Sequence, residues 1–392
     1  MTIMSNALPP TPFLSLPGAI AVDASTDAAD QDVAAHYGSP LTEQRALESG
    51  RAIVDLSTRG VISVTGTDRL TWLDSMSTQT LRSMGRGDVA EALLLDPAGH
   101  VEHALHVVDD GETAWLLVER TDAGPLLDFL QKMRFMLRVE PADRTAEFAT
   151  IGSFGLPDAV ASLAATTNGV PLVWRDGWAG VVTGGHQYAR PDHEHPGAHY
   201  DWVETLVPRA SLDALTRRVA SGEIAAAGTL AAEALRVAAW RPRLAAETDD
   251  RTVPHELDWL RTAVHLNKGC YRGQETVAKV HNLGHPPRRI VFLHLDGSQN
   301  VLVAAGDEVL AGDTVVGRVT TAAVHHELGP VALAVVKRTT DPVADLLVRS
   351  GDALVAAAQE TIVPPDAGAE ANVPRIPRLG AVTREPRNST AH

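Results

Sequence analysis

The chain has a single cysteine, no long apolar run and a deficit of basic residues. One cysteine, Cys270, cannot form an internal disulfide or complete a closed zinc site, so nothing indicates an oxidising compartment. No window of about eighteen residues is continuously apolar, and the first residues lack a basic start followed by an apolar core. Neither a membrane span nor an export signal is expected, and we predict a cytoplasmic protein.

The charge balance narrows the possible partners. The 392 residues include 34 Lys and Arg against 49 Asp and Glu, a formal net charge of -15. Such a charge repels phosphate backbones, so stable nucleic-acid binding is not expected. Apolar residues make up 44% of the chain, which is enough for large cores in two or three domains.

Strand and helix patterns alternate in the interior of the chain, whereas both ends lack periodicity. The ends are rich in Pro and Ala, which predicts poor order. Residues 93–118 read as three strands joined by turns at Pro-Ala-Gly and Asp-Asp-Gly. Helices are predicted over 69–81 and 123–137, each behind an aspartate at the cap position.

A second block of strands and helices follows, and the chain then becomes strand-only after residue 285, as in a small β-barrel. The fold class predicted is α+β. The expected division is a disordered segment 1–32, two α/β lobes at about 33–150 and 151–284, a barrel at 285–363 and a disordered tail at 364–392.

The cysteine lies in the stretch NKGCYRGQE, Asn267 to Glu275, with a glycine on each side. If this stretch is extended, Lys268 and Cys270 project to the same face, and the ammonium favours the thiolate. A helix predicted from Gln274 adds the positive end of its dipole. The glycines suggest a strained turn or the close approach of another group. The alternative is a buried, unreactive cysteine with Lys268 in solvent.

The run KGCYRGQE resembles the signature of the YgfZ-type folate-binding proteins, a branch of the family of the glycine cleavage T-protein, an aminomethyltransferase. Three other segments resemble the same family: the opening Asp55–Asp68, the run Pro254-His255-Glu256, and the segment that begins at Gly317. The resemblance covers roughly residues 36 to 345. It implies a three-lobed ring of two α/β lobes and a C-terminal β-barrel, with tetrahydrofolate or another folate at the centre.

Two segments depart from the methyltransferase pattern. The family's strand that supplies a catalytic aspartate corresponds to Gly99–Leu105, where His103 and Ala104 occupy the two acidic positions. A base must lie within hydrogen-bond reach of the proton it takes, and alanine supplies none. The family's pterin-holding segment corresponds to Trp178–His186, and its glutamate is missing. Trp178 either offers a stacking face or belongs to the core.

The resemblance implies a set of working residues. They are Cys270 as the thiol, Lys268 as the group that tunes it, and His103, Trp178, Arg236, Tyr271, Gln274 and Glu275 as folate-binding candidates. Arg236 and its neighbours Arg241 and Arg243 suit a folate carboxylate, or they pair internally with Glu233 and Glu247. No metal site is expected, because the His- and Asp-rich loop 192–199 reads as a solvated surface segment.

The function that the resemblance implies is that of a folate-binding accessory protein. It would help assemble or repair iron-sulfur clusters in client or assembly proteins, with Cys270 as its reactive group. The alternatives are a tetrahydrofolate-dependent aminomethyl or one-carbon transferase, and an inert module that only senses folate. Whether the chain is an enzyme stays open at this point.

Overall fold

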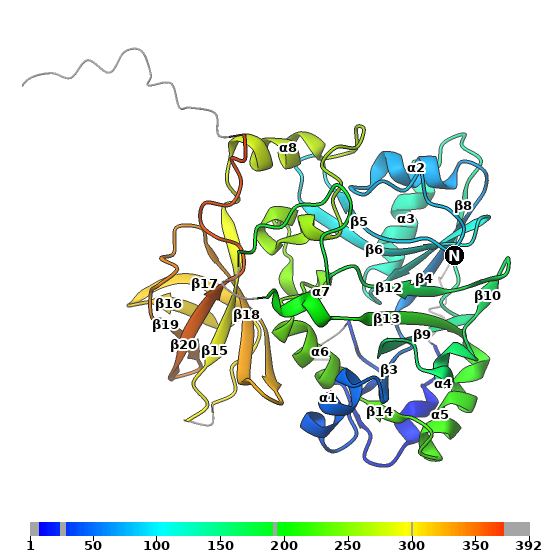
Figure 1. Cartoon of the computed structure of the whole chain (residues 1–392), viewed down its shortest axis with the longest axis horizontal. Coiled ribbons are helices and arrows are strands. Elements are labelled where there is room, and N and C mark those ends of the chain that lie inside the picture. Colours follow the sequence, from blue (N-terminus) through cyan, green and yellow to red (C-terminus); the bar gives the residue numbers. More distant parts are fainter. Residues whose placement is uncertain (1–7, 24–28, 191–193, 299–300, 372–392) are drawn as a thin grey trace, which may run out of the picture.

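The computed structural model describes residues 8–23, 29–190, 194–298 and 301–371. Two five-stranded sheets pack face to face, and a closed six-stranded barrel lies beside them (Figure 1). This arrangement confirms the predicted mixed α/β fold with a C-terminal barrel. Within the described part of the chain, every helix is too short or too polar to cross a membrane.

The first sheet takes all its strands from residues 60–143. Its order is β5 (Val89–Leu95), β6 (Val101–Asp109), β7 (Thr113–Val118), β4 (Gly60–Thr65) and β8 (Glu140–Asp143). Helices α2 (Arg69–Met76) and α3 (Ala123–Met133) cover its outer face, where Leu105 and Val107 of β6 join their core. Because strand side chains alternate between faces, Ala104 and His106 point to the inner face.

The second sheet is built from strands before and after the first. Its order is β12 (Val173–Arg175), β13 (Trp202–Pro208), β9 (Phe148–Phe154), β3 (Ala52–Leu56) and β14 (Ala225–Ala227), in which β14 and β3 are parallel. Helices α4 (Asp158–Ala161) and α5 (Leu212–Ala220) cover its outer face. The sheets therefore do not divide at residue 150, because β9 runs across that point and pairs with β3.

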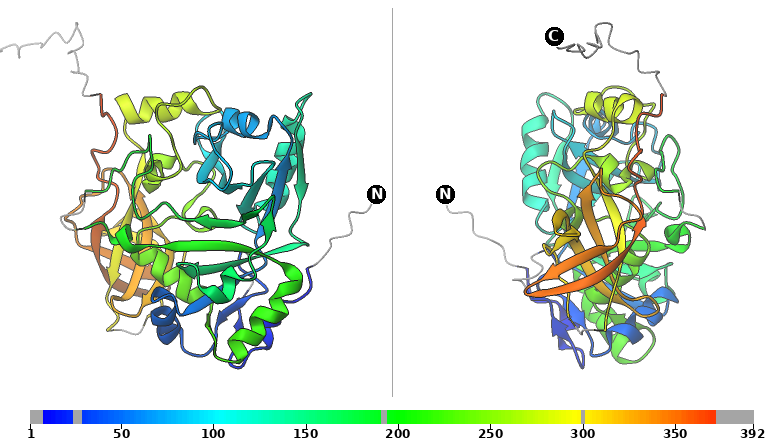
Figure 2. Two further views of the ribbon diagram at one scale, coloured as in Figure 1. Left: turned by 45° about the vertical axis from the view of Figure 1, so that its right-hand side comes forward. Right: turned by 90° about the vertical axis from the view of Figure 1, so that its left-hand side faces the viewer.

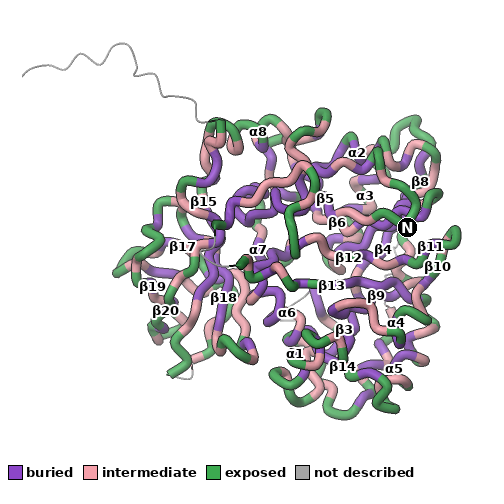
Figure 3. The backbone as a smooth tube through the Cα atoms, in the orientation of Figure 1, coloured by how far each residue is buried: buried purple, intermediate pink, exposed green. Residues whose placement is uncertain are grey.

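Helices α1 (Pro40–Glu48) and α6 (Thr229–Ala238) lie between the second sheet and the barrel (Figure 1). The barrel order is β15 (Arg288–Leu295), β18 (Gly329–Lys337), β17 (Thr314–His325), β16 (Glu308–Ala311), β19 (Leu346–Ser350) and β20 (Ala353–Thr361), and β20 pairs back onto β15. Figure 3 shows that the buried stretches run through the central strands and the barrel wall that faces them.

Smaller elements complete the chain. They are the strand pairs β1 (Ile20–Ala21) with β2 (Ala34–His36) and β10 (Thr166–Thr167) with β11 (Val170–Pro171), and the helices α7 (Leu244–Glu247) and α8 (Gln274–Leu283). The predicted helices at 69, 123 and 274 are all present, and the first two are shorter than expected.

The segment after β20, which we call the C-terminal strap (residues 362–371), returns from the barrel to α8 (Figure 2). The N–H groups of residues 369–371 donate to the carbonyl oxygens of residues 280–282, at 3.4, 2.9 and 3.2 Å. The strap thus satisfies carbonyl groups that a helix end leaves without partners. Its residue Ala367 is fully buried, so the described part of the tail expected to be disordered is packed. Residues 372–392 lie outside the described residues.

The N-terminal segment also differs from the expectation of disorder. Its short helix Pro12–Ser15 places Phe13 in the core beneath the second sheet, beside Ile53 and Ile151. Residues 1–7 and 24–28 lie outside the described residues. Phe13 and Leu16 are buried in this core, and the hydroxyl of Thr11 donates to Asp55 Oδ2 at 2.5 Å. So few anchors in a short segment leave no periodic pattern in the sequence.

We expect Phe13→Ala to lower the free energy of unfolding by about 3 to 5 kcal/mol, because it removes a fully buried ring and leaves a cavity. Urea unfolding measures the change. Ile20→Ala is the matched control, since Ile20 lies in the same segment with half of its surface exposed and should change little. Equal effects of the two variants would show that the segment does not pack as described.

Candidate functional site

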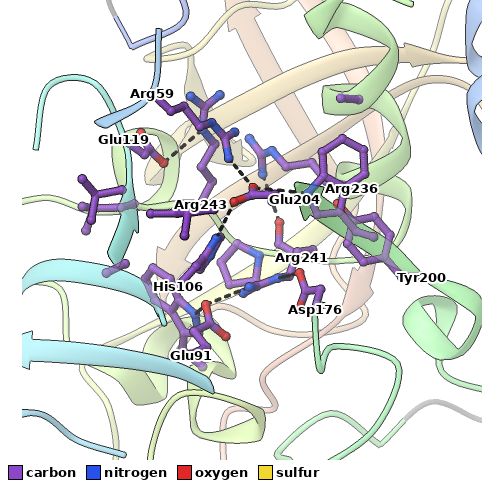
Figure 4. Close-up of a pocket in the computed structure, with 18 of the residues that line it drawn as sticks. Arg59, Glu91, His106, Glu119, Asp176, Tyr200, Glu204, Arg236, Arg241 and Arg243 are labelled. Atoms are coloured by element: carbon purple, nitrogen blue, oxygen red, sulfur yellow. Dashed lines mark hydrogen bonds and ion pairs between the residues drawn. The ribbon is translucent and has the colours of Figure 1, made fainter. Parts of the chain in front are cut away.

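A charged pocket lies where the two sheets, α6 and the segment before α7 meet (Figure 4). Its free volume is about 80 Å³. The polar residues that line it and are labelled in Figure 4 are Arg59, Glu91, His106, Glu119, Asp176, Tyr200, Glu204, Arg236, Arg241 and Arg243. A water molecule occupies about 30 Å³, so the pocket as described has room for a few waters.

Glu204 on β13 is the carboxylate that the second sheet contributes to this network. Arg59 Nη1 donates to its Oε1 at 2.5 Å, and His106 Nδ1 lies 2.9 Å from its Oε2. The His106 ring stacks on Trp174 at 3.6 Å between centroids, which fixes its plane. Burial alone would raise the pKa of Glu204, but the charges of His106 and Arg59 outweigh it and hold the pKa well below its usual range.

Arg241 joins the first sheet to the loop after β12. Its Nη2 donates to Glu91 Oε1 at 2.7 Å, and its Nε donates to Asp176 Oδ2 at 2.8 Å. Glu91 also accepts hydrogen bonds from Trp259 Nε1, at 2.8 Å, and from the hydroxyl of Thr262. Burial disfavours the charge of Arg241, but the two carboxylates outweigh it and raise its pKa further above its usual value.

Arg236 and Arg243 continue the network toward the barrel and the N-terminal segment. Arg236 pairs with Glu233 at 2.7 Å and with Glu247 at 2.9 Å. Arg243 pairs with Asp30 at 2.7 Å and with Glu119 at 3.0 Å. These arginines therefore make the internal pairs that the sequence left as one of two interpretations. Burial would raise the pKa of Glu233, but the two arginines lower it to about 2.

Three buried polar atoms of this pocket have no hydrogen-bond partner among the described residues. They are Nε of Arg59, Nη1 of Arg241 and Oε2 of Glu119. Buried polar atoms are rarely left without a partner in native proteins. The pocket therefore offers two donors and an acceptor to water or to a ligand.

His103 and Trp178, two of the folate-binding candidates, do not line this pocket. His103 projects from the opposite face of β6, where its Nδ1 lies 2.5 Å from Asp122 Oδ1 at the start of α3. Trp178 is fully buried, and its Nε1 donates to the carbonyl of Ala239 at 2.8 Å. The guanidinium carbons of Arg241 and Arg261 stand 5.0 and 5.4 Å from its ring, so it has no free stacking face. Of the two residues that occupy the family's acidic positions, His103 and Ala104, it is Ala104 that lines the pocket.

Cys270 is exposed, which excludes the buried alternative. Cys270 lies in an irregular stretch between turns at residues 266–267 and 272–273, not in a strand, so the alternation that would set Lys268 beside the thiol does not apply. The Lys268 side chain is only 3% exposed and donates to the carbonyl oxygens of Asp74, Ser77 and Gln79 at 2.7, 2.8 and 2.7 Å. An ammonium has three N–H donors, and all three are used. Lys268 therefore caps the C-terminal end of α2 instead of tuning the thiol.

Burial lowers the pKa of Lys268 below its usual value, and the carboxylate of Asp74 at 3.5 Å opposes this shift without cancelling it. Gly273 has φ +82°, and a Cβ there would stand 2.7 Å from the carbonyl oxygen of Asp96. The strained turn expected from the glycines is thus present at Gly273. Gly269 has open space around it and no such constraint.

The other motif residues do not line the charged pocket. Tyr271 and Gln274 line a separate polar groove of about 280 Å³ along α8, together with His281 and Asn267. Glu275 is exposed on the first turn of α8. Arg236 is therefore the candidate among the six that reaches the central pocket. Of the loop 192–199, Asp192 and His193 lie outside the described residues.

Known proteins resemble this chain in sequence and in fold. Residues 29–174 match the family model described as the GCVT N-terminal domain. Two curated relatives, both named Aminomethyltransferase, are 27% identical to this chain. The relative from Streptomyces avermitilis aligns over 336 residues, 79% of this chain and 85% of that protein. The relative from Synechococcus sp. aligns over 316 residues, 78% and 84%.

Among solved structures, the glycine cleavage system aminomethyltransferase T from Bartonella henselae superposes with a TM-score of 0.70. It covers 89% of this chain and 95% of its own, at 16% identity. At that identity the likeness shows the fold alone. The chain therefore has the same fold as this aminomethyltransferase, with the C-terminal barrel included.

Sequence reasoning missed the acidic residues of the pocket, although the sequence holds a signal for two of them. Glu91 and Glu204 each stand inside an otherwise apolar strand run, VAEALLL and WVETLVP. A carboxylate in a buried strand requires a charged or hydrogen-bonding partner. That signal predicts a buried network, but it does not name the partners.

We expect Lys268→Met to destabilise the fold by roughly 3 kcal/mol, because it leaves three carbonyl groups and the carboxylate of Asp74 without their cation. The reaction rate of Cys270 with a thiol reagent in the folded protein should stay unchanged. Lys279→Met, at an exposed position of α8, is the control for loss of a lysine. A slower thiol reaction with unchanged stability would contradict the capping role and restore the tuning role.

Proposed function

We propose that this chain is a YgfZ-type folate-binding accessory protein that supports iron-sulfur proteins and uses Cys270 as its working thiol. The observation that carries the proposal is the exposure of Cys270 in the KGCYRGQE motif, next to a left-handed turn at Gly273. A working thiol must be reachable by a partner. The cluster or its iron is the cargo of this activity, and the client protein is its partner.

The pocket chemistry supports binding of a folate. A pterin ring has adjacent N–H groups that can donate hydrogen bonds to a carboxylate such as Glu204. The carboxylates of a folate glutamate tail can pair with the guanidinium of Arg236 or Arg241. The donors Arg59 Nε and Arg241 Nη1 are buried without partners among the described residues. These residues fit the chemical groups of a folate.

The space in the pocket is narrower than such a ligand requires. Pockets for small molecules commonly measure about 300 to 1,000 Å³, whereas this one measures about 80 Å³. The ion pair between Arg59 and Glu204 crosses it, and Arg59 is the partner with some exposure. Binding therefore requires Arg59 to leave Glu204, so that the ligand takes over the carboxylate.

The same pocket argues against aminomethyl transfer. Ala104 faces the pocket at a position where the T-protein pattern has an acidic residue. Each of the five carboxylates lining the pocket, Glu91, Glu119, Asp176, Glu204 and Glu233, is paired with an arginine. A neighbouring cation lowers the affinity of a carboxylate for a proton, and the pKa values of Glu91, Glu204 and Glu233 lie below their usual range. At Asp176 burial outweighs the charge of Arg241 and raises the pKa, although both groups stay paired.

A tetrahydrofolate-dependent aminomethyl or one-carbon transferase is the second candidate. The likeness to two relatives named Aminomethyltransferase, over about four fifths of the chain, favours it. An assay of aminomethyl transfer to tetrahydrofolate separates the two candidates. We expect no transfer from this chain.

Titration with tetrahydrofolate, followed by calorimetry, tests the pocket. We expect Glu204→Gln to raise the Kd about tenfold or more, because it removes a charge-assisted hydrogen bond. Glu275→Gln, an exposed residue of α8, is the matched control and should bind like the wild type. An unchanged Kd in Glu204→Gln, with the fold intact by thermal unfolding, would place any folate elsewhere.

Complementation of cells that lack this protein tests whether Cys270 is required for its function. We expect the wild type to restore the activity of [4Fe–4S] dehydratases and Cys270→Ala to fail, while its folding and folate affinity stay unchanged. The reason is that no other thiol exists in the chain. Ser298→Ala, an exposed control elsewhere, should restore activity fully. Restoration by Cys270→Ala would remove the thiol from the proposal, and transfer activity in the assay above would favour the second candidate.

A further inference from the structure

The turn between α3 and β8 exposes three consecutive large apolar side chains. Phe135, Met136 and Leu137 are 78%, 98% and 44% exposed. Single exposed apolar residues are ordinary on protein surfaces, but a contiguous run marks an interaction site or an aggregation hazard. We call these three residues the apolar tip.

The structure holds the apolar tip firmly in place. Before it, the carbonyl oxygen of Met133 accepts a hydrogen bond from Trp72 Nε1 at 3.2 Å. After it, the guanidinium of Arg138 donates twice to the carboxylate of Asp68, at 3.0 and 3.2 Å. Trp72 belongs to α2, and Asp68 is the N-cap residue that precedes this helix. Exposure of the tip is thus a built feature rather than the fraying of a helix end.

The backbone of the apolar tip carries strain. Phe135 has φ +46°, in the left-handed region that costs a bulky side chain free energy. The turn is closed by the N–H of Leu137, which donates to the carbonyl of Arg134 at 3.1 Å. Such strain persists only where the surrounding structure enforces it, and it keeps the tip in its exposed position.

Two cations flank the apolar tip. Lys132 and Arg134 are exposed and make no ion pair within the described residues. Unpaired cations beside an apolar surface complement a partner that carries carboxylates next to an apolar side chain.

The apolar tip follows α3, whose last two turns line a pocket together with the loop that carries the thiol. An open pocket of about 550 Å³ is lined by Phe129 and Met133 of α3 and by Arg272 of the cysteine motif. The Arg272 guanidinium stands 5.7 Å from the Phe129 ring and pairs with Glu102 at 2.9 Å. A partner side chain seated in this pocket would contact Arg272, which is two residues after Cys270 in the sequence.

We propose that the apolar tip, its two cations and the adjoining pocket form the docking surface for the client protein, which presents an acidic segment with an apolar anchor. The inference rests on the proposed role of Cys270 and adds where the client binds. A lipid surface suits the features less well, because a flat bilayer does not fill a concave pocket and an acidic chain is repelled by anionic headgroups.

The cell assay of dehydratase activity tests the surface with two double variants. We expect Phe135→Ser with Met136→Ser, and separately Lys132→Glu with Arg134→Glu, to leave activity at the level of cells without the chain. Thermal unfolding, folate affinity and the thiol reaction rate of both should match the wild type. Val343→Ser, which removes an apolar side chain that is 86% exposed elsewhere, is the matched control and should restore activity.

The possible outcomes distinguish the proposed docking surface from the proposed role of Cys270. Full restoration by both double variants, while Cys270→Ala fails, would overturn the docking surface and leave the thiol function standing. Failure of the double variants while Cys270→Ala restores activity would keep the surface and remove the thiol. Restoration by all variants would overturn both.

Two further measurements exclude other occupants. Sedimentation with vesicles of phosphatidylcholine and phosphatidylserine would overturn the inference if the wild type binds and the tip variants do not. Sedimentation velocity would overturn it in favour of a second copy of this chain if a dimer forms that the tip variants abolish. We expect neither binding to vesicles nor a tip-dependent dimer.

Discussion

Three arginines within eight residues, Arg236, Arg241 and Arg243, hold the parts of this molecule together. Arg236 pairs with Glu247 of α7 and donates to Thr321 of the barrel at 2.7 Å. Arg241 pairs with Glu91 of the first sheet, and Arg243 pairs with Asp30 of the N-terminal segment. Buried charges are costly unless each has a partner, so removing one member strands the others. The relative placement of sheets and barrel therefore depends on this network being complete.

The same network limits what the pocket can do. Each carboxylate is paired with a guanidinium, so the pocket has charge and hydrogen-bonding capacity but no carboxylate without a cation beside it among the described residues. A ligand that enters must exchange an existing ion pair for its own contacts. The pocket therefore admits a charged ligand only where one of these pairs opens.

The sequence was informative where the structure is local. The helix from Gln274 and the turn at Gly273 follow from a helical pattern behind a glycine, and the C-terminal strands follow from their spacing. It was less informative where partners are distant. Lys268 was placed with Cys270 because they are neighbours in the chain, yet its ammonium binds groups up to 194 residues away. Glu204 and Arg59 are separated by 145 residues, and no local pattern reports such a pairing.

The C-terminal strap links the end of the barrel to α8. It leaves the barrel, crosses to α8 and hydrogen-bonds to the last carbonyl groups of the helix whose other end begins at Gly273, beside the thiol loop. A rigid helix transmits displacement along its axis. A displacement of the barrel end would therefore reach the first turn of α8, beside the loop that carries the sulfur, through the hydrogen bonds of the strap.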